Sequence, residues 1–206
     1  MTLKKLLHWI WTTLAIGTLA SLVLGIFLIA YSEEFSFLEV SAAGFNVETI
    51  IFVILGGATI SVLSQMGFFS YLVLRYIAIG IFKSRLLWDI LQVMLILITF
   101  FDFIYLRYTN FKVEGQNVID FSLVPVVLLF LSLAVTYWKV KETNKSAFIS
   151  TLFFLFVATT IEAVPALKLN SISSDLFMLT PLFVCNAWQI MLLHRIVGNK
   201  KEPTAG

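Results

Sequence analysis

Residues 47–72 read VETIIFVILGGATISVLSQMGFFSYL and carry a single charged side chain, that of Glu48. A run of about 20 apolar residues is long enough for a helix to cross the hydrocarbon core of a bilayer. Five other runs have the same character, and the six segments are about 6–31, 47–72, 86–106, 118–138, 147–167 and 176–197. The sequence therefore predicts an all-α fold, a polytopic bundle of six transmembrane helices that forms one integral membrane domain over residues 1–206.

The composition of the whole chain excludes several classes of protein. Of its 206 residues, 60% are hydrophobic and 13% are charged, whereas soluble domains average about 45–50% and about 25%. So few charges cannot cover that much apolar surface in water. The composition excludes a soluble enzyme, a nucleic-acid binder and a disordered chain. Segment 6–31 is too long for the apolar region of a signal peptide, so we expect it to be a span.

The basic residues are distributed unevenly between the two sides of the predicted bundle. With the N-terminus inside and the spans alternating, 11 of the 14 basic residues fall on the inner side, and the outer side holds Arg107, Lys112 and Lys168. An excess of Lys and Arg marks the cytoplasmic side of a membrane protein. We therefore expect a multi-pass protein of the cell membrane, with both termini in the cytoplasm.

Residues 73–85, VLRYIAIGIFKSR, do not fit a simple division into spans and loops. The segment is apolar but carries Arg75, Lys83 and Arg85. Such a segment either lies on the inner membrane surface as an interfacial helix or extends the second span. We favour an interfacial helix here.

Polar residues on the third span follow helical spacing. Asp89, Gln92, Thr99 and Asp102 fall within an arc of about 140° of a helix. This face should point into the bundle rather than at lipid. Asp89 follows Arg85 by four residues, so an ion pair between them is expected.

Asp102 and Glu162 are acidic residues within predicted spans, both about one turn from the outer end. Two carboxylates that face each other would share a proton and would suit a proton relay or a cation site. Pairing with a basic residue is the alternative, with Arg107 or Lys168 for Asp102 and Lys168 for Glu162. The sequence does not decide between the two.

Other polar side chains have the spacing of helix contacts. Gly57, Ser61 and Gln65 follow one another at four-residue steps on the second span, a spacing that lets helices approach closely. On the sixth span, Asn186 and Gln189 are three residues apart, and His194 lies near the inner end. Hydrogen bonding between helices or contact with a ligand would both explain these residues.

The sequence shows no catalytic apparatus. It lacks the H-E-x-x-H pattern of a metalloprotease and the G-x-S-x-G turn of a serine hydrolase. Its two histidines have no Cys or carboxylate at ligand spacing, and its single cysteine, Cys185, lies in an apolar run. Pro125, Pro165 and Pro181 fall near predicted span ends rather than inside broken helices. We expect no catalytic residue, no metal and no cofactor.

Several of these polar residues lie in stretches that resemble a known family. The stretches are SQMGFFSYLVLRYIAIGIFKS (64–84), LWDILQVMLILITFFDFIYLRY (87–108), AFISTLFFLFVATTIEAVPAL (147–167) and PLFVCNAWQIMLLHRI (181–196). They resemble the KinB-signalling pathway activation proteins, the KbaA family of spore-forming bacteria. The resemblance implies a membrane protein that promotes sporulation in the pathway of the membrane sensor histidine kinase KinB, and that is not an enzyme. The resemblance assigns no catalytic residue to this sequence.

Two functional hypotheses follow. The first is a regulator that contacts a sensor kinase of the KinB type in or at the membrane and favours one of its states. The second is a small transporter or permease coupled to protons or ions through Asp102 and Glu162.

Overall fold

The computed structural model describes residues 3–31, 47–82, 84–112, 117–167 and 172–197, and every element in these ranges is helical. The α-helices are α1 (Leu3–Tyr31), α2 (Val47–Phe82), α3 (Arg85–Phe111), α4 (Leu123–Glu142), α5 (Phe148–Phe153), α6 (Thr159–Leu167) and α7 (Ile172–Val197). The 3-10 segments are η2 (Val118–Phe121) and η3 (Lys145–Ala147), and η4 (Phe154–Ala158) is a π-helix. Because η3, α5, η4 and α6 are continuous, the described residues form six helical spans that are long and apolar enough to cross a membrane.

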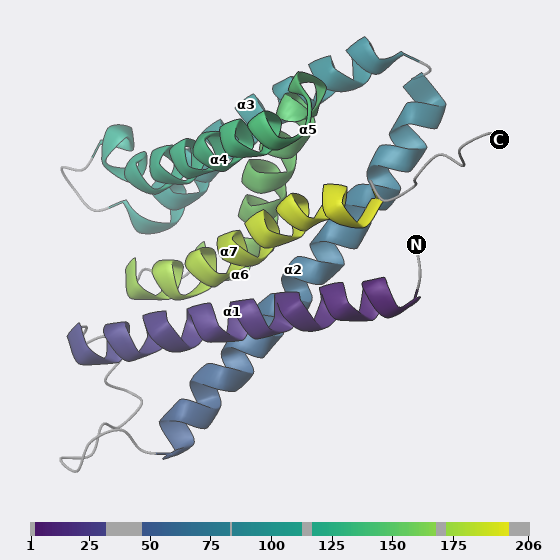
Figure 1. Ribbon diagram of the computed structural model, residues 1–206. Helices are drawn as coiled ribbons and strands as arrows, with labels where there is room; N and C mark the ends of the chain where they lie inside the picture. The colour runs from purple at the N-terminus through teal and green to yellow at the C-terminus, as the bar shows by residue number, and fades with distance from the viewer. Residues whose placement is uncertain (1–2, 32–46, 83, 113–116, 168–171, 198–206) are drawn as a thin grey trace.

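The second span extends further than the sequence predicted. Helix α2 runs without interruption over 36 residues to Phe82, so residues 73–82 continue this helix and the expected separate interfacial helix is wrong. At a rise of 1.5 Å per residue α2 is about 54 Å long, well beyond the hydrocarbon thickness of about 30 Å. In Figure 1 it crosses the other helices diagonally. Its length is compatible with a strongly tilted span or one that projects beyond the core.

Small residues let α1, α2 and α7 approach closely. A Cβ atom on Gly17 of α1 would lie 3.1 Å from Ser61 Cβ and would also collide with Cys185 Sγ of α7. Farther along the same contact, a Cβ on Gly57 would lie 2.6 Å from Ser21 Cβ. The Gly57–Ser61 spacing therefore marks a close helix contact, as predicted.

This contact predicts that Gly17→Leu destabilises the bundle. A leucine has no room between α2 and α7, and overpacking of this kind costs about 1–3 kcal/mol of unfolding free energy. Thermal unfolding of the purified protein in detergent measures the effect. Ala15→Leu, on the exposed side of α1, is the control and should leave the midpoint nearly unchanged; equal effects of both substitutions would contradict the close contact.

The fifth span, η3 to α6, lies at the centre of the fold. In its most apolar window 56% of the residues are buried, against 22–39% in the other five spans. Phe154, Leu155 and Phe156 of η4 are fully buried, and the Phe154 ring lies 5.3 Å from that of Phe68 and 5.0 Å from that of Tyr71, between centroids. The fifth span is no more apolar than most of the others, so its burial follows from its central position among them.

Both prolines of the last spans lie inside helices. Pro165 is two residues from the end of α6, near a span end as expected, whereas Pro181 lies farther inside α7 than expected, several residues from either end. A proline inside a helix removes one backbone hydrogen bond. In a bundle of this kind neighbouring groups can compensate for that loss.

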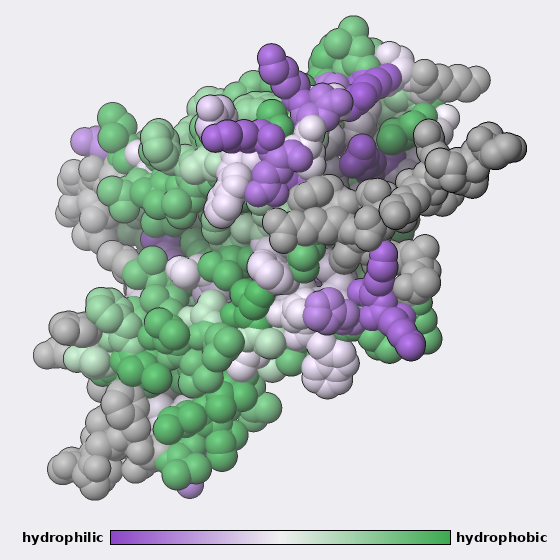
Figure 2. All heavy atoms as spheres, in the orientation of Figure 1, coloured by the Kyte–Doolittle hydropathy of each residue, from purple (hydrophilic) through white to green (hydrophobic). Residues whose placement is uncertain are grey.

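The first residues of α1 and the last residues of α7 lie at the same end of the bundle (Figure 1). Figure 2 shows that most hydrophilic atoms gather toward this end, whereas broad hydrophobic surfaces cover the helices elsewhere. Among the described basic residues, Lys4, Lys5, Arg85, Lys141 and Lys145 belong to helix ends or connections on this side. This arrangement agrees with the charge asymmetry found in the sequence.

Candidate functional site

A cluster of polar side chains joins α2, α6 and α7 inside the bundle. Ser64 donates to Asn186 Oδ1 (2.7 Å), and Gln189 Nε2 donates to the Ser64 hydroxyl (2.7 Å). Asn186 Nδ2 donates to Thr159 Oγ1 and to Glu162 Oε2, each at 3.0 Å. We call these five residues the polar cluster. Of the residues predicted from sequence, Glu162, Asn186 and Gln189 meet here.

Helical spacing on each element brings the five side chains together. Asn186 and Gln189 lie three residues apart on one face of α7, and Thr159 and Glu162 have the same spacing on α6. Thr159 directly follows the π-helix η4. A π-helix inserts an extra residue into the helical repeat and often occurs at functional sites.

Glu162 leaves one carboxylate oxygen without a donor. Its Oε2 accepts from Asn186, but Oε1 is buried and has no hydrogen-bond partner within the described part of the chain. Glu162 packs over Gly67 of α2, where a Cβ atom would lie 2.6 Å from Glu162 Cδ. Only glycine leaves room for the carboxylate at this position.

The same two residues line a groove of about 440 Å³ between α2 and the η4–α6 segment. We call it the Glu162 groove. Its other lining residues are Ser70, Tyr71, Leu74, Phe153, Val157, Ala158 and Ile161. Most of this surface is apolar, and Ile161 is 62% exposed, so the groove opens on the side of the bundle. It combines an apolar lining with a hydrogen-bond acceptor that finds no donor in the described part of the chain.

The remaining polar residues predicted from the sequence lie apart from this cluster. Gln65 donates from Nε2 to the Ile10 carbonyl of α1 (3.3 Å), and Gln92 Oε1 accepts from the Ser150 hydroxyl (3.3 Å). Asp89 lines a separate cavity near the start of α3. The side chain of His194 lies outside the described residues.

The expected Arg85–Asp89 ion pair is not formed, and neither is the alternative pair of Asp102 with Arg107. Arg85 donates to the Ser146 carbonyl (2.9 Å) and makes no ion pair with Asp89, although both of these side chains belong to the described residues. Asp102 is exposed, so the polar face of α3 does not point wholly inward. Arg107 pairs with Asp175 of α7 instead of Asp102. The other expected partner, Lys168, lies outside the described residues.

Asp102 and Glu162 do not form a facing pair. Asp102 is exposed on α3 and makes no hydrogen bond or ion pair with a described residue, whereas Glu162 points toward Gly67 and Asn186 in the interior. The arrangement that would suit a shared proton is therefore absent between these two side chains.

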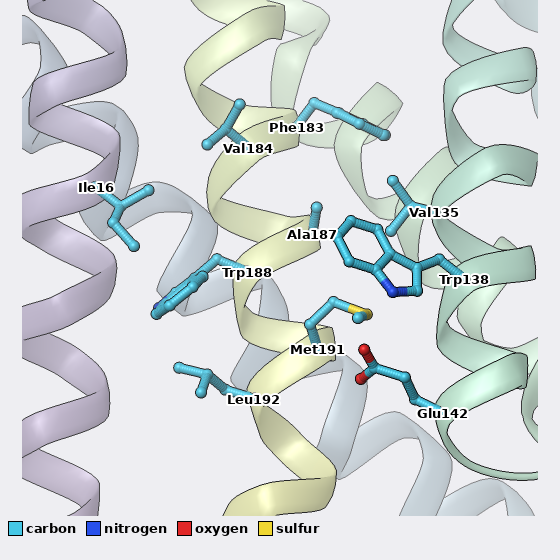
Figure 3. Close-up of a pocket in the computed structure, with 10 residues that line it drawn as sticks. All are labelled: Ile16, Val135, Trp138, Glu142, Phe183, Val184, Ala187, Trp188, Met191 and Leu192. Carbon is cyan, nitrogen blue, oxygen red and sulfur yellow. The ribbon is translucent and has the colours of Figure 1, made fainter.

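A second groove, of about 320 Å³, lies on α7 between α1 and α4 (Figure 3). Ile16 lines it from α1, Trp138 and Glu142 from α4, and Trp188 and Met191 from α7. Its lining is almost wholly apolar, with Glu142 at one end (Figure 3). It offers packing surface, whereas the Glu162 groove also offers a buried polar group.

Sequence reasoning missed several residues of these contacts. Ser64 and Thr159 are hydroxyl residues in apolar runs, which carry no distinctive signal. Asp175 falls just before a predicted span, where an acidic residue is unremarkable, yet it forms a buried ion pair with Arg107. The role of Gly67 depends on Glu162, which is distant in sequence.

Comparisons with known proteins cover nearly the whole chain. The family model KbaA, described as KinB-signalling pathway activation in sporulation, matches residues 17–196. The KinB-signaling pathway activation protein of Bacillus subtilis (strain 168) is 34% identical over 199 residues, which are 96% of this chain and 100% of that protein. No solved structure gives a significant match. A match of this extent shows that the chain belongs to the KbaA family.

Proposed function

We propose that this protein is an integral membrane regulator that promotes activation of a sporulation sensor kinase of the KinB type, by contact between helices within the membrane. The observation that supports a role in this pathway is membership of the KbaA family, whose model matches residues 17–196. The six apolar helices support a location in the cell membrane with both termini in the cytoplasm.

The Glu162 groove supports helix contact as the mode of action. In lipid, helices associate through close packing and through hydrogen bonds between polar side chains. Gly67 leaves room for the Glu162 carboxylate beside the groove, and Glu162 Oε1 is an acceptor without a donor among the described residues. A partner helix that places a hydroxyl, amide or ammonium group in the groove would supply that donor once the carboxylate turns toward it, because Oε1 is buried in the protein alone.

The contact must distinguish two states of the kinase. A regulator shifts such an equilibrium only by its difference in affinity for the two states. One hydrogen bond between helices in a membrane is worth about 0.6–1.7 kcal/mol, which corresponds to an affinity difference of about three- to eighteenfold. A kinase donor that reaches Glu162 in only one of the two states would therefore shift the equilibrium between them by about this factor.

The transport alternative rests on a pair of carboxylates at similar depth. Since Asp102 is exposed and Glu162 lies in the interior cluster, no observation on these residues favours transport over regulation.

Site-specific photo-crosslinking in sporulating cells tests the contact. A photoreactive amino acid at Ile161, which lines the groove, should crosslink to the sensor kinase. Val23 of α1 is similarly exposed, 71% against 62% for Ile161, and does not line the groove. It is the control position and should give no kinase adduct. An adduct from Val23 as strong as that from Ile161, or none from Ile161, would contradict the proposal.

A further inference from the structure

A second polar site lies where α2 ends and α3 begins. It is a cavity of about 390 Å³, lined by Arg75, Ile79, Ser84, Arg85, Trp88, Asp89 and Ser150. The helices that form it meet at the end of the bundle where α1 starts and α7 ends (Figure 1). None of its lining residues belongs to the polar cluster or lines the Glu162 groove.

The side chains around this cavity carry a net positive charge. Arg75 and Arg85 contribute two guanidinium groups, against the single carboxylate of Asp89. Arg85 is held in place by its bond to the Ser146 carbonyl (2.9 Å). A guanidinium group has five N–H donors, so this bond leaves others for a ligand.

The first turn of α3 adds backbone donors at the same place. Ser84 is extended at the N-cap position, and its side chain caps no backbone N–H group. The first amides of a helix lack acceptors within the helix, and together with the helix dipole they favour an anion. Ser84 and Arg85 both line the cavity.

Buried side-chain donors provide an independent indication of a ligand. Trp88 lines the cavity and is 3% exposed, yet its indole Nε1–H has no hydrogen-bond partner among the described residues. One turn deeper, Gln92 Nε2 is also buried without a partner, although Gln92 Oε1 accepts from Ser150. Buried polar groups are nearly always paired. Both unpaired groups here are donors, so the missing group is an acceptor.

We infer that this cavity binds a phosphate group, held by Arg75, Arg85, the first amides of α3 and the Trp88 indole N–H. A phosphate offers several strong acceptor oxygens and a charge that matches the guanidinium groups. The carboxylate of Asp89 in the same cavity disfavours a dianion. A singly charged phosphodiester, such as that of an anionic phospholipid headgroup, therefore suits the charges better than a phosphate dianion.

The position of the cavity along α2 fits a headgroup. Glu48 and Arg75 are separated by 27 residues of continuous helix, which is about 40 Å. A bilayer including both headgroup layers is about 40–45 Å thick. A helix that begins at one membrane surface and runs close to the membrane normal would bring Arg75 to the headgroup level of the other.

Two probes on the purified full-length protein test this site and separate the two sources of phosphate. Native mass spectrometry measures retention of phosphatidylglycerol against phosphatidylcholine of matched chains. Inorganic phosphate is titrated in phosphatidylcholine nanodiscs, with thermal stability as the readout.

The double variant Arg75→Gln/Arg85→Gln should weaken binding of phosphatidylglycerol or phosphate about tenfold or more. Lys141→Gln removes an exposed charge outside the cavity and should leave binding within about twofold.

A second variant controls for misfolding of the double variant. Trp88→Phe keeps an aromatic ring against Phe82 and Phe153 and removes the N–H donor together with part of the indole, so binding should fall about threefold. Preferential retention of phosphatidylglycerol supports a lipid headgroup, and stabilisation by inorganic phosphate alone supports a free phosphate ligand. The inference would be overturned if each probe bound to the two cavity variants as strongly as to the wild-type protein.

Discussion

Gly67→Leu is expected to reduce sporulation to about the level of a strain that lacks the gene, while the protein still accumulates in the membrane. A Cβ atom at this position would lie 2.6 Å from Glu162 Cδ, so the carboxylate must leave its place and break its bond to Asn186. The leucine side chain would also fill part of the Glu162 groove. Loss of the close packing and of the acceptor together should weaken kinase contact about tenfold or more.

The matched control lies on the same helix. A Cβ atom on Gly80 of α2 would meet nothing within 4 Å, so Gly80→Leu gives the same gain in helix propensity without touching the groove. Spore counts and immunoblots of the membrane fraction measure function and protein level for both variants. Normal sporulation with Gly67→Leu at a normal protein level would contradict a role for the groove.

Asp175→Ala should destabilise the protein more than Gly17→Leu does. Asp175 is 1% exposed and Arg107 is 8% exposed, and the two form an ion pair between α7 and α3. Removing one partner of a buried pair leaves the other charge uncompensated, at a cost of about 3–5 kcal/mol. Reversible unfolding in mixed micelles measures this loss as a fall in the free energy of unfolding.

Two further variants isolate the pair. Arg107→Met together with Asp175→Leu removes both charges and should recover most of the lost stability, because apolar replacement of a whole buried pair is often neutral. Asp102→Asn, on the same helix as Arg107 but exposed, should not lower stability. If the double variant is as unstable as Asp175→Ala, the loss does not arise from an uncompensated Arg107.

Features that depend on one helix at a time were predictable from the sequence. Each span is a continuous run of apolar residues, and its length relative to a bilayer is a property of that run. The Gly57–Ser61 contact was also predictable, because four-residue spacing places both on one face. The end of α2 was not, because an apolar segment with a few basic residues suits both an interfacial helix and an extended span.

The partners of the polar residues depend on contacts between distant segments and could not be predicted. Local spacing suggested Arg85–Asp89, but the Ser146 carbonyl on another element binds Arg85 instead. Similar depth suggested Asp102 and Glu162 as a pair, yet depth does not specify rotation about the helix axis. The π-helix η4 changes that rotation in the fifth span, and an apolar run gives no sign of it. Asn186 and Gln189 were identifiable as polar contacts, but Ser64 as their shared partner was not.

Stimulation of the sensor kinase in proteoliposomes tests the central proposal most directly. The kinase is reconstituted alone, with the wild-type protein, or with the Gly67→Leu or Gly80→Leu variant, and autophosphorylation is measured with labelled ATP. We predict that the wild-type protein raises the rate of autophosphorylation, that Gly80→Leu does so equally, and that Gly67→Leu does not. An unchanged rate with the wild-type protein, or equal stimulation by the wild type and Gly67→Leu, would contradict activation through the Glu162 groove.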